Sequence, residues 1–165
     1  MRKKTIELSF DVYESIDQLN ESDAALLTKA REQTKTAYAP YSNFLVSAVA
    51  RLNNGKIIMG TNQENASYPV SICAERTLLA STGAIFPNEP IDTMAITYHN
   101  MNPNTVSNHP ISPCGMCRQA LVESENRFKQ PIRLILSGME GAVYVIAKAD
   151  QLLPLSFNGE DLLGK

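Results

Sequence analysis

The chain has 165 residues, and 44% of them are hydrophobic. A chain of this length can bury about 70% of its unfolded surface, so it needs no cross-links to hold a core. The formal charge is −2, and the 15 Lys and Arg residues are scattered without a basic stripe, which argues against nucleic acid as a partner. We also expect no membrane segment and no secretory signal, because the apolar runs are short and residues 5–11 are mixed.

The cysteine count bears on the compartment. Three cysteines are an odd number, which does not suit the paired disulfides of a small secreted protein. Free thiols are typical of a reducing compartment, where they remain available to bind a metal. We therefore predict a cytoplasmic protein.

The chain begins with a predicted N-terminal arm, residues 1–19, which precedes a single domain at residues 20–165. Apolar residues alternate along the arm, as they do in a short strand or an ordered extension. These alternating residues are Ile6, Leu8, Phe10 and Val12.

A first helix is predicted from about residue 20 to residue 38. Asn20 or Ser22 can cap its start, and Pro40 stops it. Apolar and small residues recur at helical spacing and should form its packed face. These residues are Leu27, Ala30, Thr34 and Ala37.

Strands and helices then alternate. Residues 53–55 (NNG) have the chemistry of a hairpin turn and should join two antiparallel strands. A helix that opens at Cys73 should end near Gly83, which suits a left-handed cap, and a later helix should cover residues 114–126. The strands are expected at residues 44–52, 56–61, 92–99, 132–137 and 142–147. This order predicts a layered α/β sheet of mixed direction.

After the last predicted strand, apolar residues cluster again near the C-terminus. This tail cluster, residues 152–157 (LLPLSF), needs a partner surface.

Residues 112–119 (SPCGMCRQ) carry the clearest sign of a metal site. Cys114 and Cys117 are three apart at the start of a predicted helix, so both sulfurs face the same side of its first turn. Zinc–thiolate bonds of about 2.3 Å place tetrahedral sulfurs about 3.8 Å apart, which this spacing can reach. A redox pair or two buried cysteines would fit the motif alone equally well.

Residues 73–76 (CAER) add a third thiolate and a carboxylate at the start of another predicted helix. Three protein ligands leave one position of a tetrahedral zinc open for water, as in catalytic sites. Two helix N-termini would offset the negative charge of the thiolates, and Arg76 can donate to a ligand sulfur. Glu75 can serve as the base for the water; taken alone, it is equally a glutamate favoured by the helix dipole.

Ligand, glutamate and Pro-Cys-x-x-Cys together form the zinc deaminase pattern. Over residues 37–162 the chain resembles the small homotetrameric cytidine deaminases. The resemblance rests on five segments: 38–44 (YAPYSNF), 62–66 (NQENA), 73–77 (CAERT), 112–119 and 152–157. It implies a three-layer α/β/α fold with a mixed five-stranded sheet. It also implies one Zn²⁺ per subunit, bound by Cys73, Cys114 and Cys117, and a homotetramer with shared active sites.

The same resemblance assigns the substrate contacts. Asn62 and Glu64 match positions that bind the ribose 3′-hydroxyl, and a carboxylate there favours a nucleoside over a nucleotide. Phe44 matches the aromatic that lies against the pyrimidine. Ala66 and Tyr68 match a segment that reaches a neighbouring subunit's nucleoside, and Phe157 matches a tail aromatic that completes the pocket across the interface.

The implied reaction is hydrolytic deamination of cytidine and 2′-deoxycytidine to uridine and 2′-deoxyuridine, with release of ammonia. Glu75 would take a proton from zinc-activated water, protonate N3 with it and afterwards protonate the leaving amine. Backbone groups around Ala74, Ser112 and Pro113 would hold the pyrimidine edge.

The chain departs from the family pattern in four places. Ser47 and Ser71 stand where glycine is common, and both changes bear on pocket shape. Residues 100–109 and the arm are longer than the family minimum, and the longer loop can reshape the pocket rim or an interface.

Three other functions fit parts of the sequence pattern. The first is a structural zinc module with His99 or His109 as a fourth ligand. The second is a deaminase for a nucleoside antibiotic such as blasticidin, against which the tail cluster argues. The third is a polynucleotide editor, which the dispersed charge and Glu64 disfavour.

Overall fold

Six strands form one mixed sheet in the spatial order β1-β6-β5-β4-β2-β3. The computed structural model describes residues 1–164. Its helices are α1 (Glu21–Gln33), α2 (Ala74–Ile85), α3 (Gly115–Phe128) and α4 (Gly159–Leu163). The strands are β1 (Asp11–Tyr13), β2 (Phe44–Leu52), β3 (Ile57–Thr61), β4 (Ile91–Asn100), β5 (Arg133–Ser137) and β6 (Val143–Ile146). Only β4 and β5 pair in parallel; the other neighbours are antiparallel.

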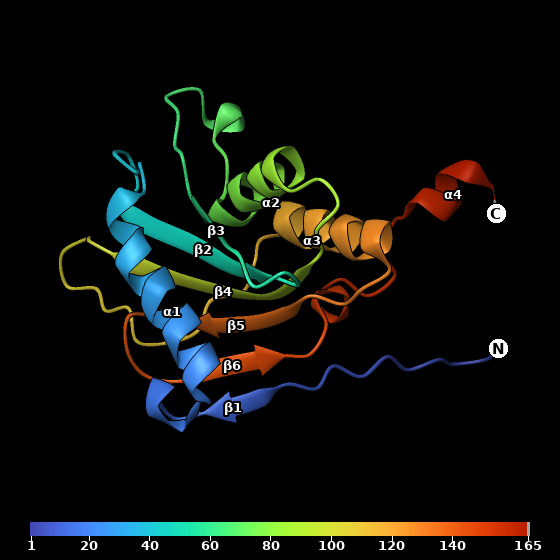
Figure 1. Cartoon of the computed structure of the whole chain (residues 1–165), viewed down its shortest axis with the longest axis horizontal. Coiled ribbons are helices and arrows are strands. Elements are labelled where there is room, and N and C mark those ends of the chain that lie inside the picture. Colours follow the sequence, from blue (N-terminus) through green and yellow to red (C-terminus); the bar gives the residue numbers. More distant parts are fainter. Residues whose placement is uncertain (165) are drawn as a thin grey trace.

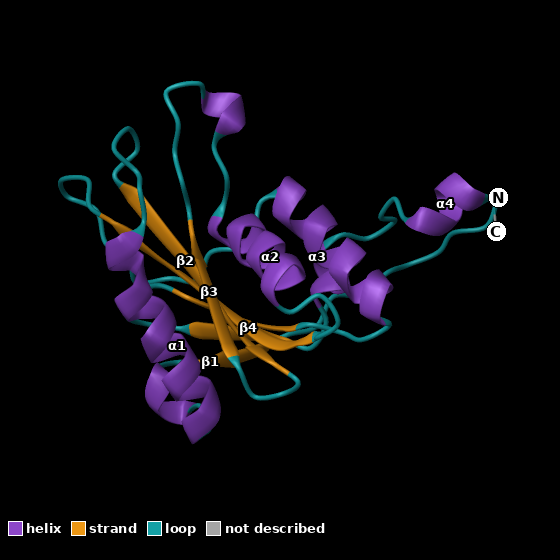
Figure 2. Cartoon of the chain, turned by 45° about the horizontal axis from the view of Figure 1, so that its top comes forward, coloured by secondary structure: helices purple, strands orange, loops and turns teal. Residues whose placement is uncertain are grey.

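Helices cover both faces of the sheet, so the three layers are as predicted (Figures 1 and 2). Successive residues of β2 alternate between the two faces, as strand geometry requires. Ala48 and Ala50 share one buried cluster with Leu78 of α2 and Leu121 of α3. Val49, between them, packs with residues of α1 in the other. Both halves of the core therefore use the same central strands.

The sixth strand corrects the prediction of a five-stranded sheet. Strand β1 comes from the arm and pairs antiparallel with β6, with Val12 opposite Tyr144. The Phe10 ring packs on Tyr144, with their centroids 4.8 Å apart, and Tyr13 packs against the α1 side of the core. These tertiary contacts place the end of the arm on the sheet, although Phe10 and Val12, like Ile6 and Leu8, remain exposed.

The start of α1 and the first hairpin are as predicted. The side chain of Asn20 accepts a hydrogen bond from the Asp23 N–H at 3.0 Å and caps the helix. Gly55 has a φ of +79° in the turn between β2 and β3, a conformation that glycine adopts without steric cost.

Two predicted helix ends are wrong. Helix α1 ends at Gln33, and residues 34–36 continue as one turn of 3-10 helix, so regular α-helix does not reach residue 38. Helix α2 runs through Gly83 to Ile85. Gly83 does not adopt a left-handed conformation there, because Phe86 provides the C-cap. A glycine near the end of a helix can terminate the helix but need not do so.

The tail cluster finds a partner surface only in part. Leu152 is buried in the core cluster that contains α2 and α3, whereas Leu155 and Phe157 are exposed. Within residues 1–164, no helix combines the length and the apolar character needed to cross a membrane.

Strand β3 and helix α2 approach each other closely at Gly60. A Cβ atom at this position would lie 2.5 Å from the Leu78 nitrogen and 2.6 Å from the Ala74 carbonyl oxygen. Both are backbone atoms of the helix, which cannot move aside without shifting the helix itself. The absence of a side chain at Gly60 therefore fixes where the first turn of α2 lies.

We expect Gly60→Ala to lower the free energy of unfolding by about 1 to 3 kcal/mol, the usual cost of overpacking. Gly83→Ala is the matched control. The nearest atom to its added Cβ is 3.8 Å away, so this helical substitution should stabilise the protein by about 0.5 to 1 kcal/mol. Denaturant unfolding measures both. Equal stability of Gly60→Ala and the wild type would contradict the close packing.

Candidate zinc and active site

The three cysteines come together, although Cys73 is 41 residues from Cys114 in sequence. Their sulfurs all lie within 4.8 Å of one another. The Cys73 and Cys114 sulfurs are 3.7 Å apart, and those of Cys114 and Cys117 are 3.3 Å apart. These separations are close to the about 3.8 Å expected around a tetrahedral zinc, so the donor set fits this metal.

Two helix N-termini converge on this cluster. Cys73 is the N-cap of α2, and Cys114 is the N-cap of α3. Their carbonyl oxygens accept the first bonds of the two helices, from the N–H groups of Thr77 at 3.0 Å and Arg118 at 2.9 Å. The positive ends of both helix dipoles therefore point toward the sulfurs and favour thiolate over thiol.

Hydrogen bonds between the thiols shift the pKa values of Cys73 and Cys117 in opposite directions. Hydrogen bonding with Cys117 lowers the pKa of Cys73 to about 6, against the effect of burial, and hydrogen bonding with Cys114 and the charge of Arg76 act in the same direction. The same bond with Cys73, followed by burial, raises the pKa of Cys117. Cys73 is therefore the more acidic of these two thiols. A bound cation would favour the ionised form of all three.

Glu75 lies in the first turn of α2 and is only 4% exposed. Burial raises the pKa of its carboxyl group, and the negative charge of Cys73 adds to this effect. A carboxyl group whose pKa is raised holds a proton more readily than a free one, and this property suits a proton shuttle.

A cavity of about 230 Å³ opens onto Cys73, Cys114 and Glu75. Its remaining lining residues come from β2, from the position just after β3, from the start of α2 and from the segment before α3. They are Phe44, Val46, Asn62, Ala74, Ile111 and Ser112. Val46 and Ile111 were not predicted from the sequence. Val46 could have been found from the alternation of β2, because it points to the same face as Phe44.

Asn62 is held by the backbone of β2. Its Oδ1 accepts from the Val46 N–H at 2.8 Å, and its Nδ2 donates to the Phe44 carbonyl at 2.9 Å. A carboxamide offers two donors and two acceptor sites. One of each therefore remains for a ligand, on a side chain whose orientation is fixed.

Glu64 lies outside this cavity, in a neighbouring hollow lined also by Tyr41, Ser42, Tyr68 and Ser71. One of its carboxylate oxygens accepts from the backbone N–H groups of Tyr41 and Ser42, at 2.9 and 3.2 Å. Desolvation would raise the pKa of Glu64, but the hydrogen bonds from Ser42 and Tyr41 outweigh it and lower the pKa. Glu64 is therefore an anion at neutral pH.

The structure does not bring three predicted substrate contacts into the cavity of their own chain. Ala66, Tyr68 and Phe157 are exposed. Tyr68 packs edge-on against Tyr41 at 5.9 Å, and the Phe157 carbonyl accepts a hydrogen bond from Gln119 on α3 at 2.8 Å. Their assigned contact with a neighbouring subunit's substrate stays a prediction, as does the hydrogen bond from Arg76 to a ligand sulfur.

Neither histidine belongs to the metal cluster in the part of the chain that the structure describes. His109 instead contacts the Tyr98 hydroxyl. This placement disfavours a closed structural zinc site with a histidine ligand.

The two serines at positions where glycine is common differ in effect. Ser47 donates to the Ala30 carbonyl of α1 and is fully buried, on the face opposite the cavity. It therefore does not alter the pocket. Ser71 lines the outer hollow beside Glu64 and accepts from the Asn65 N–H at 3.0 Å.

Arg118 holds the segment in front of Cys114, a role that the sequence did not reveal. It donates to the Pro113 carbonyl at 2.8 Å and to the Leu152 carbonyl at 2.9 Å. The tail is thereby tied to the start of α3.

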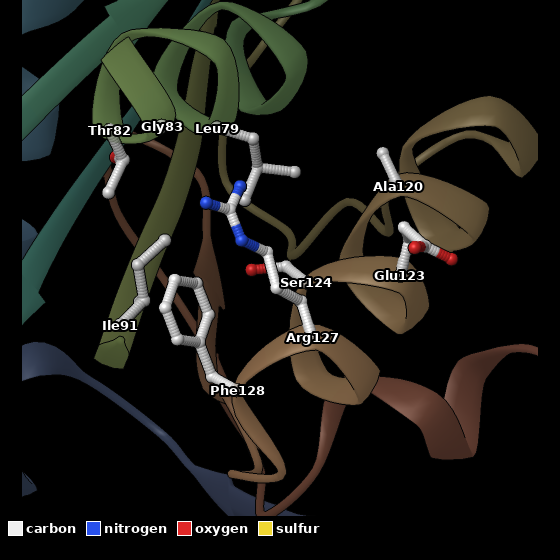
Figure 3. A pocket seen from close by; sticks show the side chains of 9 residues that line it. All are labelled: Leu79, Thr82, Gly83, Ile91, Ala120, Glu123, Ser124, Arg127 and Phe128. Carbon is white, nitrogen blue, oxygen red and sulfur yellow. The ribbon is translucent and has the colours of Figure 1, made fainter. Parts of the chain in front are cut away.

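A different cavity of about 160 Å³ lies between the C-terminal parts of α2 and α3 (Figure 3). Leu79, Glu123, Arg127 and Phe128 are among its lining residues, and no cysteine is. At a rise of about 1.5 Å per residue, Arg127 lies about 15 Å along α3 from Cys117. The reactive groups therefore gather at the other end of this helix pair.

Comparison with known proteins shows the family. The family model for the cytidine and deoxycytidylate deaminase zinc-binding region matches residues 20–130. This chain belongs to the cytidine deaminase family. It is 33% identical to a cytidine deaminase of Halalkalibacterium halodurans over 83% of this chain and 95% of that protein. It is 36% identical to one of Sporosarcina psychrophila over 81% and 88% of the two chains.

A solved structure supports the same family membership. The crystal structure of a cytidine deaminase from Burkholderia pseudomallei matches with a TM-score of 0.70 and 38% identity. The match covers 84% of this chain and all of that one. The domain is thus a zinc-binding deaminase domain, and the three-cysteine cluster is where it could hold the ion.

Because the chain has only three cysteines, thiol reactivity counts the ligands directly. In the zinc-loaded protein we expect all three to react slowly with a chromogenic disulfide, and about three equivalents to become reactive after chelation. Metal analysis should find one zinc per chain before chelation and none after it. A thiol that reacts at the same rate with and without zinc would not be a ligand.

Proposed function

We propose that the protein deaminates cytidine and 2′-deoxycytidine by hydrolysis, in the cytoplasm, for pyrimidine salvage. The observation that carries this proposal is the buried Glu75 beside three clustered thiols at the wall of one cavity. Zinc held by Cys73, Cys114 and Cys117 would supply a Lewis acid that makes water nucleophilic near neutral pH. Family membership supports the same chemistry.

Glu75 moves the protons in this proposal. Its carboxylate takes a proton from the attacking water and delivers it to N3 of the pyrimidine as the C4–O bond forms. It then passes the second proton of the water to the exocyclic amine, so that the C4–N bond breaks and ammonia leaves. The raised pKa of Glu75 suits this exchange, because the carboxyl group gains and loses a proton twice in each cycle.

The remaining cavity residues bind and orient the nucleoside. Phe44 presents its ring to the pyrimidine. Asn62 offers its free donor and acceptor to the ribose 3′-hydroxyl, and the Glu64 carboxylate accepts from the same hydroxyl. The negative charge of Glu64 repels a phosphate, so a nucleoside is preferred over a nucleotide.

Glu64 and Tyr68 lie in the hollow beside the zinc cavity, and this arrangement supports a shared site. Ala66, Tyr68 and Phe157 expose their side chains, as groups that contact a neighbouring copy would. We propose a homotetramer in which these residues complete the nucleoside pockets of adjacent subunits.

Glu75→Gln should retain one zinc per chain and lose at least about 100-fold in kcat for cytidine, as expected for the loss of general acid–base catalysis. Release of ammonia and metal analysis measure the two properties. Glu123→Gln on α3, at the cavity of Figure 3, is the matched control and should keep full activity. Turnover by Glu75→Gln at the wild-type rate would refute the shuttle. No turnover by the zinc-loaded wild type would refute the proposed function.

Glu64→Gln should reduce the preference for cytidine over 3′-deoxycytidine. A hydrogen bond to a charged group is worth about 1.5 to 3 kcal/mol, or about 10- to 100-fold in kcat/KM. We expect the wild type to show this preference and the variant to lose most of it, while Glu32→Gln, on the exposed side of α1, keeps it. An unchanged preference in Glu64→Gln would show that another group binds the hydroxyl.

A further inference from the structure

Three rings stand in a row behind the cavity wall. Phe44 lines the cavity and stacks on Tyr98, with centroids 4.9 Å apart and an interplanar angle of 17°. Tyr98 in turn meets His109 edge-on, with centroids 5.7 Å apart. The Tyr98 hydroxyl lies 3.2 Å from His109 Nδ1, within hydrogen-bond distance. One face of the Phe44 ring is therefore occupied, and the other is left for a ligand.

The middle ring cannot move freely. Tyr98 lies opposite Val46 in the pairing of β2 with β4 and is only 2% exposed. A buried tyrosine hydroxyl usually finds a hydrogen-bond partner. His109 is that partner, and it lies on the long loop of residues 100–109 that connects β4 with the segment before α3.

The loop that carries His109 is fastened at both ends. Near β2, Asn102 Nδ2 donates to the Ser42 carbonyl at 2.8 Å, and the Met101 N–H donates to the Asn43 carbonyl at 2.9 Å. Both acceptors belong to the turn just before Phe44. Ser107, only 7% exposed, accepts from the Asn100 N–H at 2.8 Å.

The other end of the loop lies against the turn between β5 and β6. A Cβ at Gly138 would be 2.2 Å from the Ser107 carbonyl oxygen, and a Cβ at Gly141 equally close to that of Asn108. The two glycines thus permit the loop backbone to pack directly on this turn. Two residues after His109 the chain reaches the cavity wall at Ile111 and Ser112.

We propose that Tyr98 and His109 form a positioning pair that holds the Phe44 ring for the pyrimidine, and that the long loop exists in part to supply His109. The pair acts through Phe44 and does not touch the reacting atoms. It therefore sets substrate binding, and the chemical step at Glu75 is independent of it. This inference rests on the proposed function, because it assigns the base-binding end of the same site.

The first test is a kinetic cycle on the zinc-loaded protein with cytidine. Tyr98→Phe and His109→Ala should each raise KM about 3- to 10-fold, the usual effect of one lost hydrogen bond, and change kcat less than about twofold. The KM of the double variant should be no higher than that of the more impaired single variant, because both substitutions remove the same contact. His99→Ala is the control, since adjacent strand residues point to opposite faces of the sheet.

Repeating Tyr98→Phe in the Phe44→Leu variant distinguishes positioning of the Phe44 ring from a purely structural role. Without the Phe44 ring, Tyr98→Phe should have no further effect on KM. An equal rise of KM in both backgrounds, or no rise in either, would overturn the positioning role.

The second test does not depend on turnover. NMR of protein with ¹³C-labelled phenylalanine rings reports on five side chains, and Phe44→Leu identifies the signal of Phe44. Ring flips of Phe44 should become faster in Tyr98→Phe and in His109→Ala and stay unchanged in His99→Ala. Unchanged flips in the first two variants would overturn the pair. Inactivity of the wild type with cytidine would overturn the proposed function alone, because the ring motion still tests the pair.

Discussion

The meeting of two helix starts is the constraint on which the rest of the structure depends. A zinc site of three thiolates needs the first turns of α2 and α3 at one point, although they are separated by a whole strand and a long loop. Gly60 allows β3 to approach α2 at backbone distance, which fixes one helix. Glu125 fixes the other from its far end: its buried carboxylate accepts from the N–H groups of Ile132, Ala149 and Asp150.

The same geometry offsets the negative charge of the thiolates. Three thiolates and a carboxylate within one small volume repel one another, and burial makes this repulsion stronger. The helix N-termini place partial positive charge beside Cys73 and Cys114, while Arg76 lowers the pKa of Cys73 further. Glu75 lies deeper and responds in the opposite direction, with a raised pKa. The pKa values of Cys73 and Glu75 are thus shifted in opposite directions, although the two residues lie in one helical turn.

Much of this could be predicted from the sequence because its signals are local. Cysteine spacing, the cap at Asn20 and the NNG turn each depend on a few adjacent residues, and all appear as expected. The failures have tertiary causes. Strand β1 forms because Phe10 and Tyr13 find partners on the sheet, which the alternation in the arm could not show. Helix α2 continues past Gly83 to Ile85, where Phe86 provides its C-cap. The contact of His109 with Tyr98 joins a loop to a strand and has no motif.

The pocket divides into two halves of different character. Around the thiols, the walls are strands and helix starts fixed by backbone contacts. A metal ion and a pyrimidine would therefore bind to a preformed surface. Around Glu64 and Tyr68, the walls are loop residues that remain open in a single chain. Under the proposed function, the chemistry that needs fixed distances belongs to the first half, whereas the sugar would contact the half that a neighbouring copy would close. The Phe44 ring lies in the first half, where Tyr98 stacks on it, and this support would extend to the bound pyrimidine.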